Sequence, residues 1–205
     1  MEQIILNNDQ KDALQEVANI GAAHAATALS MMVGINIDMG IPEVEIVPVE
    51  NSIDRVKDQE NVAGVFLRIE EGIPLNILML LSKDSAFSLS NILMGEESNK
   101  PKDILSEMDE SAIKEVGNVM MTSFFDSITE FLGVSLIPGP PSFTYNNPAA
   151  VMEYVLSKIG DVTKEAVVFN CDVMKEGSED FSIDLFLLPS PSSVKLILEK
   201  LGMVT

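Results

Sequence analysis

Residues 10–33 read QKDALQEVANIGAAHAATALSMMV, and this stretch decides how the first half of the chain folds. It contains no proline, and its apolar side chains recur every three or four residues, which predicts one long amphipathic helix. Asn7 and Gln10 have the spacing of a capping box at its start. Gly34 stands where a left-handed residue ends a helix. The helix should therefore bury one face and leave a polar face for solvent or a partner.

Outward from this helix, runs rich in β-branched residues alternate with helical patterns. In the first half they predict strands at about 43–49, 62–70 and 74–81 and a helix at about 84–94 that ends at Gly95. In the second half they predict a helix at about 107–132, capped by Ser106 with Asp109 and followed by Gly133, then strands near 142–146, 165–174 and 181–188 and a helix at about 191–201 before Gly202. The fold class is therefore α+β, a mixed αβ domain.

The chain resembles itself when it is shifted by 99 positions. This shift aligns Glu16–Ile20 with Glu115–Val119, Gly34 with Gly133 and Pro42 with Pro141. After the first strand the shift becomes 107, so the second copy carries about eight extra residues around 147–160. We therefore expect an internal duplication, one domain over 1–205 made of repeats at about 1–98 and 99–205, with a pseudo-two-fold axis.

Charge and composition exclude several classes of function. Thirteen Lys and Arg against 32 Asp and Glu give a net charge of −19, which repels nucleic-acid phosphates and anionic lipids. One cysteine and one histidine provide neither an internal disulfide nor a zinc-ligand set. No apolar run approaches the roughly 20 residues that span a bilayer, and the N-terminus lacks the pattern of a signal peptide. We expect a cytoplasmic protein without nucleic-acid binding or membrane insertion.

Polar residues repeat at the same spacing on both long helices. Asp12, Glu16 and Asn19 are spaced i, i+4 and i+7, so they fall within about 60° of one another on one helix face. The second copy has the same spacing in Ser111, Glu115 and Asn118. A single Glu-x-x-Asn pattern is most often a solvated surface, and duplication alone would explain its repetition. These residues by themselves leave a solvated face and a functional site both open.

The longer pattern points to a family. The two copies read Asp12-x3-Glu16-x2-Asn19-x22-Pro42 and Ser111-x3-Glu115-x2-Asn118-x22-Pro141. Both resemble the signature [DS]-x3-E-x2-N-x22-P of the CheC family of chemotaxis phosphatases at every defined position. The CheX branch carries one such motif, and the FliY branch adds a C-terminal flagellar-switch domain. Two motifs in 205 residues are similar to the stand-alone CheC branch.

The resemblance implies a fold, an activity and site residues. The fold would place two long active-site helices against a largely antiparallel six-stranded sheet. The activity would be hydrolysis of the aspartyl phosphate of the chemotaxis response regulator CheY. Asn19 and Asn118 would each position the attacking water, and Glu16 and Glu115 would dock the receiver; Asp12 and Ser111 would support them or bind the partner. The protein would need no cofactor or metal of its own, because phosphorylated CheY would bring Mg²⁺.

The same resemblance leaves a second function open, that of a non-catalytic adaptor binding CheD, CheY or both. Residues 147–159, present only in the second copy, read as a short amphipathic helix, and we expect this helix with an exposed Tyr154 to form part of a CheD surface. Of the remaining chemically notable residues, His24 is interpreted as structural or surface, Cys171 as a strand residue rather than a nucleophile, and Pro42 and Pro141 as structural.

Overall fold

The computed structural model describes residues 7–52, 54, 56–73, 75–95, 104–133, 135–159, 164–175 and 181–190, together with 193, 196 and 199. The helices are α1 (Asn8–Val33), α2 (Lys83–Met94), α3 (Glu107–Leu132) and α4 (Pro148–Lys158), with a 3-10 turn η1 (Val49–Asn51). The strands are β1 (Ile37–Met39), β2 (Glu43–Pro48), β3 (Val62–Glu71), β4 (Leu75–Ser82), β5 (Ile137–Pro138), β6 (Ser142–Asn146), β7 (Glu165–Lys175) and β8 (Phe181–Pro189). The helix expected at 191–201, with Gly202, falls largely outside the described residues.

The strands form one antiparallel sheet in the order β1-β7-β8-β4-β3-β5, in which β2 also pairs with β7 and β6 also pairs with β3. The prediction of an α+β fold with a largely antiparallel sheet is confirmed. The described sheet has eight strands rather than the expected six, because a short segment before each motif proline also pairs. Pro42 and Pro141 lack an N–H, so each interrupts its edge strand and divides it into two pieces.

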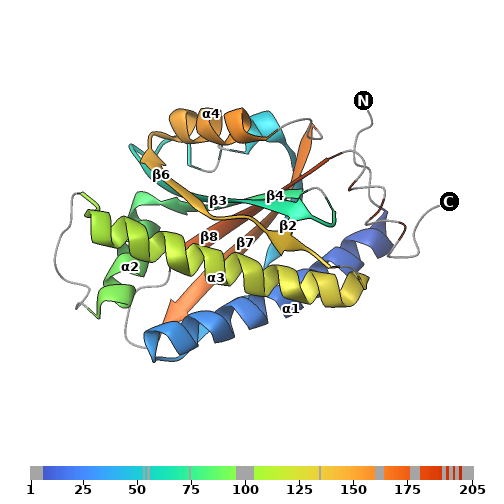
Figure 1. Cartoon of the computed structure of the whole chain (residues 1–205), viewed down its shortest axis with the longest axis horizontal. Helices are drawn as coiled ribbons and strands as arrows, with labels where there is room; N and C mark the ends of the chain where they lie inside the picture. Colours follow the sequence, from blue (N-terminus) through green and yellow to red (C-terminus); the bar gives the residue numbers. More distant parts are fainter. Residues whose placement is uncertain are drawn as a thin grey trace.

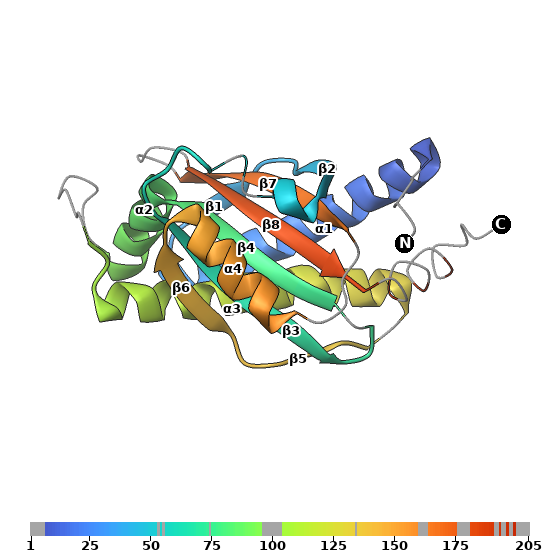
Figure 2. The ribbon, with the colours of Figure 1, turned by 90° about the horizontal axis from the view of Figure 1, so that it is seen from above.

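Helices cover both faces of this sheet. Figure 1 shows α1 and α3 side by side and antiparallel below the sheet, with α2 at one end of the pair and α4 above the sheet. Figure 2, turned by 90°, shows α4 lying across the opposite face from α1 and α3. The elements run α1-β1-β2-β3-β4-α2 and then α3-β5-β6-α4-β7-β8. The internal duplication inferred from the sequence remains a prediction.

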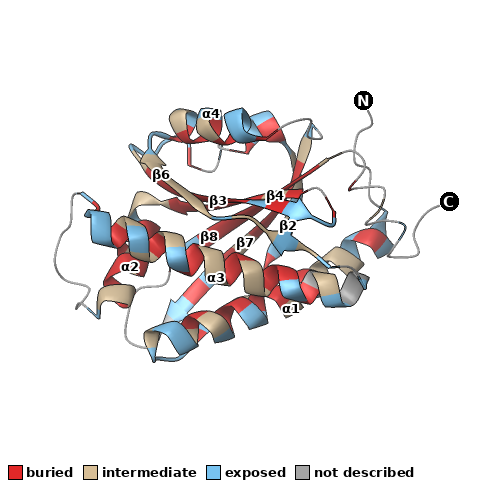
Figure 3. Ribbon diagram, in the orientation of Figure 1, coloured by how far each residue is buried: buried red, intermediate tan, exposed pale blue. Residues whose placement is uncertain are grey.

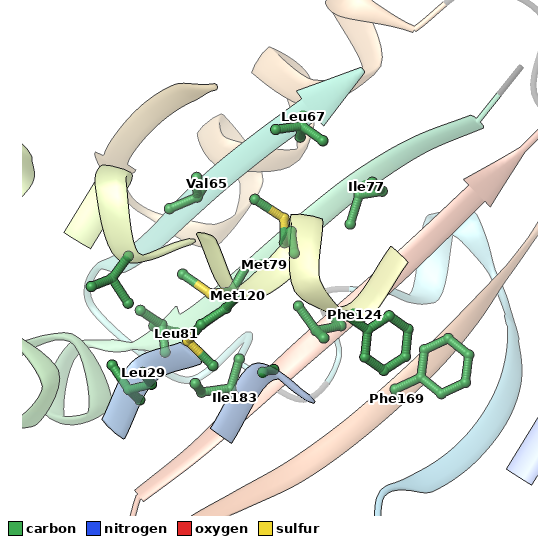
Figure 4. Close-up of a cluster of buried hydrophobic side chains, with 14 of the residues drawn as sticks. Leu29, Val65, Leu67, Ile77, Met79, Leu81, Met120, Phe124, Phe169 and Ile183 are labelled. Carbon is green, nitrogen blue, oxygen red and sulfur yellow. The ribbon is translucent and has the colours of Figure 1, made fainter. Parts of the chain in front are cut away.

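Two hydrophobic cores lie on the two faces of the sheet, and the buried residues run along both (Figure 3). Neighbouring residues of β4 show the alternation: Met79 belongs to the core under α1 and α3, whereas Leu78 belongs to the core under α4. In the larger core Phe124 of α3 packs against Phe169 of β7, with ring centroids 5.2 Å apart (Figure 4). The sheet thus holds α1 and α3 with their outer faces free.

Local signals set the bounds of the long helices. Asn7 with Gln10 and Ser106 with Asp109 form complete capping boxes at the starts of α1 and α3. The helices end at Gly34 (φ 69°) and Gly133 (φ 62°), which adopt the left-handed conformation that glycine tolerates. All four predictions are confirmed, which is why the helix limits read from the sequence match those of the structure to within two residues.

The extra segment of the second half forms α4, as expected. Its side toward the sheet contributes Val151, Met152 and Val155 to the smaller core. Tyr154, expected to be exposed, is half-buried and packs against the same core, because it lies next to Val155 on the edge of the buried face. This part of the prediction is wrong. Cys171 is fully buried in β7, which fits its interpretation as a structural residue.

Candidate functional site

Helices α1 and α3 contact each other closely at their centres. A Cβ atom added to Gly21 would come within 2.5 Å of the ring of Phe124, so the α1 backbone lies directly against this side chain. The helices also meet through the residues that follow these two by three positions in the sequence: Ser127 Oγ of α3 lies 2.9 Å from His24 Nδ1 of α1. His24, interpreted from the sequence as structural or surface, is exposed and joins the two helices through this contact. Both helices lie side by side on the same face of the sheet (Figure 1).

The polar residues of the first motif lie on the outer face of α1. Asp12 and Glu16 are exposed and Asn19 is half-buried, whereas the neighbouring Val17 and Ala18 are buried. The Asn19 side chain is therefore accessible from outside at the edge of the helix. The helix is divided in this way because its small and apolar residues pack into the core, which leaves the polar residues outside.

The second motif has the same arrangement on α3. Ser111 and Glu115 are exposed and Asn118 is half-buried. Gly117 lies beneath the motif, where an added Cβ would come within 2.9 Å of Val65 Cγ2 and 2.8 Å of Met79 Cε. This close approach seats α3 on β3 and β4 and leaves Asn118 near the outer surface.

The structure groups the six residues into two sites. Within each helix Glu and Asn lie one turn apart, as predicted. Because α1 and α3 are antiparallel and meet near Gly21 and Phe124, the two motifs lie on opposite sides of this crossing, on the order of 10–20 Å apart along the pair. The two Asn side chains therefore cannot act on the same bond, and each motif is a separate candidate site.

The motif proline of the first copy contacts the motif asparagine through a residue that the sequence analysis missed. Gln15 Nε2 donates a hydrogen bond to the carbonyl of Pro42 and lies 3.4 Å from Asn19 Oδ1, also as donor. The i, i+4 spacing of Gln15 and Asn19 was visible in the sequence, but the contact with Pro42, 27 positions away, was not. Pro42 is buried, which agrees with its structural interpretation.

The outer surfaces of the two sites differ in charge. On α1 three exposed acidic residues spaced i, i+3 and i+7, Asp9, Asp12 and Glu16, form an acidic stripe. The corresponding positions on α3 form a mixed stripe of Met108, Ser111 and Glu115, in which Met108 is 69% exposed. With the exposed Glu107, one turn before Ser111, the second site presents two carboxylates where the first presents three. A basic partner surface would meet a stronger field at the first site.

Within the described part of the chain, no three His, Cys, Asp or Glu side chains come together in a way that could hold a metal ion. No described helix is long and apolar enough to span a membrane.

Comparison with known sequences adds independent findings. Residues 10–46 and 108–145 each match the CheC-like family, and these two segments contain both motifs. The chain is 24% identical over 200 residues to the CheY-P phosphatase CheC of Bacillus subtilis, a match that covers 96% of each protein. It is 25% identical over 136 residues to the flagellar motor switch phosphatase FliY of the same organism; this match covers 66% of the chain but 35% of that longer protein.

Comparison with solved structures supports the fold. The crystal structure of Thermotoga maritima FliY superposes with a TM-score of 0.78 at 24% identity, covering 97% of this chain and 98% of that one. A chain of the FliM–SpeE complex from H. pylori superposes with a TM-score of 0.71 at 10% identity, with 97% of each chain covered. At these identities the likeness establishes the shared architecture alone.

Proposed function

Because this chain belongs to the CheC-like family, we propose that it hydrolyses the aspartyl phosphate of the chemotaxis response regulator CheY. Two relatives that are named as phosphatases support this proposal, one of them over nearly the whole chain. The observation that carries it is the pair of accessible asparagines, Asn19 and Asn118, each one turn after an exposed glutamate on an outer helix face.

The chemistry requires little from the phosphatase. In the reaction, a water oxygen bonds to phosphorus while the bond from phosphorus to the aspartyl oxygen breaks, which yields inorganic phosphate and a free carboxylate. The receiver would supply Mg²⁺ and cationic groups that neutralise the phosphoryl oxygens. The missing element is a group that holds the water in line, and the carboxamide of Asn19 or Asn118 has both a donor and an acceptor for this purpose.

The glutamates are proposed to dock the partner. Glu16 and Glu115 are exposed one turn before each asparagine, so their carboxylates can pair with a lysine at the rim of the receiver site. Such exposed pairs set orientation and encounter rate more than affinity. Asp12 and Ser111, a further turn back and also exposed, would extend this contact surface.

The test compares phosphate release from phosphorylated CheY by the wild type, Asn19→Ala, Asn118→Ala and the double variant. Each single variant should lose part of the activity, and the double variant should lose about 10²-fold or more while still binding CheY. Asn36→Ala, at an exposed asparagine outside both motifs, is the matched control and should keep the wild-type rate. Equal rates in the wild type and the double variant would instead support a non-catalytic adaptor.

A partner role for the deamidase CheD rests on α4. This helix exposes Leu156, 44% accessible, between Glu153 and Lys158 on its outer side. Val155 is fully buried, so a charge there would disrupt the core rather than test a surface. Leu156→Asp should weaken CheD binding without changing the unfolding midpoint, and unchanged binding in a pull-down titration would count against this partner.

A further inference from the structure

The side chain of Gln15 connects three parts of the first site. Its Nε2 is the donor both to the Pro42 carbonyl and, at 3.4 Å, to Asn19 Oδ1. Gln15 and Asn19 are half-buried, and Pro42 is buried. A carboxamide nitrogen carries two hydrogens in fixed directions, so one group can serve both acceptors at once.

The Pro42 carbonyl is itself held in place. The N–H of Gly40, two residues earlier in the same turn, donates to the carbonyl of Asp172 in β7 at 2.9 Å. The proline ring restricts φ at position 42, and the next residue, Glu43, pairs with Asn170 of β7, so the backbone on both sides of this carbonyl is held. The turn is therefore fixed to the sheet, and the hydrogen bond from Gln15 to the Pro42 carbonyl connects this fixed turn to α1.

We propose that Gln15 is a positioning residue for Asn19; this inference rests on the proposed phosphatase function. With one lone pair of Oδ1 used by Gln15, the second lone pair and the Nδ2 hydrogens of Asn19 remain for the attacking water. A hydrogen bond also limits the rotamers of Asn19, which reduces the ordering required when the partner binds. The spacing of 22 residues between Asn19 and Pro42 then has a structural reason: it brings the chain back from the end of α1 so that the Pro42 carbonyl reaches Gln15.

The second copy has a different residue at this place. Lys114 corresponds to Gln15 in the 99-residue shift and is half-buried on α3. An ammonium is a flexible point charge, whereas a carboxamide is planar and directs its hydrogens. The proposal therefore applies to the first site, and it predicts that the two sites respond differently to changes at these two positions.

The experiment uses the full chain with Asn118→Ala, which leaves the first site as the source of hydrolysis. Adding Gln15→Met keeps the side-chain length and removes the N–H donors. We expect kcat to fall about tenfold with KM for phosphorylated CheY nearly unchanged, because water positioning is lost while the docking carboxylates remain. Gln15→Lys retains donors and should keep a kcat closer to that of the parent than Gln15→Met does. The reverse order would count against the proposal.

Two controls separate positioning from structural damage. In the Asn19→Ala chain, where the second site acts, Gln15→Met should leave kcat unchanged, because Asn19 is no longer there to be positioned. In the Asn118→Ala chain, Lys114→Met should have no effect. A general loss of stability would lower activity in both backgrounds and would appear as a lower urea midpoint.

The results of these experiments can contradict the role of Gln15 and the proposed phosphatase function separately. A wild type that releases no phosphate from CheY would overturn the phosphatase proposal. An active wild type whose Asn118→Ala form is inactive would overturn both the catalytic role of Asn19 and the positioning role of Gln15. An Asn118→Ala form that is active but indifferent to Gln15→Met would overturn the role of Gln15 alone.

Discussion

Gly21 of α1 lies against the ring of Phe124 of α3, at a distance that leaves no room for a side chain on the glycine. Phe124 is 1% exposed and packs against Phe169, with ring centroids 5.2 Å apart, so its ring has little room to move away. This contact sets how closely the two site-bearing helices approach each other.

Gly21→Ala should destabilise the protein although alanine is the better helix former. The gain of about 1 kcal/mol in helix propensity is outweighed by overpacking, which costs about 1–3 kcal/mol. We expect a net loss of up to about 2 kcal/mol in the free energy of unfolding, measured by urea denaturation. Ala23→Gly, at an exposed position of the same helix, measures the propensity effect separately. A Gly21→Ala chain more stable than the wild type would show that the helices can separate freely.

Salt should affect the two sites unequally. The Asn118→Ala chain, which uses the acidic stripe, should lose kcat/KM several-fold between about 50 mM and about 300 mM NaCl, because the Debye length falls over this range. The Asn19→Ala chain, which uses the mixed stripe, should lose less. Met108→Asp in that second chain adds a carboxylate and should steepen its dependence. Equal slopes in all three chains would contradict a docking role for these charges.

Cys171 should be unreactive in the folded protein. Burial raises the pKa of its thiol to about 12 from an ordinary 9.0, and the nearby Asp184 and Asp172 add to the rise. At pH 8 the thiolate fraction is then about a thousand-fold below that of an exposed cysteine. Labelling by a thiol reagent should require unfolding, and Cys171→Ala provides the blank. Rapid labelling of the native chain would show that β7 opens readily.

The same shift predicts a loss of stability in alkali. The unfolded thiol releases its proton near pH 9, whereas the folded thiol retains it to about pH 12, so the unfolded state binds fewer protons in this range. The free energy of unfolding should therefore fall as the pH rises from about 9 to about 12. The Cys171→Ala chain should show a smaller decline across this interval in urea titrations, and identical declines would exclude the thiol as the cause.

Asp109 should matter more for stability than its counterpart in the first capping box. Its carboxylate, 3% exposed, accepts hydrogen bonds from the Ser106 backbone N–H (2.8 Å), the Ser106 hydroxyl (2.7 Å) and the hydroxyl of Ser90 in α2. Asp109→Ala removes a cap and leaves buried donors without this acceptor, so we expect a loss of about 2–3 kcal/mol. Gln10→Ala should cost about 1 kcal/mol. Similar urea midpoints for the two variants would mean that the link to α2 contributes little.

Elements whose signals are local were predicted well. The helix from Asn8 to Val33 follows from apolar periodicity, a capping box and a terminal glycine, which all lie within the segment itself. The strands β1 and β5 were missed, because three and two residues are too few to show alternation. The exposure of Tyr154 was wrong because the width of the buried face of α4 depends on what lies beneath the helix.

The sequence by itself determined two capped helices, each carrying a glutamate and an asparagine on its polar side, because helical spacing and caps act over a few residues. Only the tertiary structure decided that these helices run antiparallel as two separate sites, and that Gln15 meets the carbonyl of Pro42 beside Asn19. Such contacts join residues far apart in the chain, so they form only when the sheet has folded and its edge holds the Pro42 turn against α1.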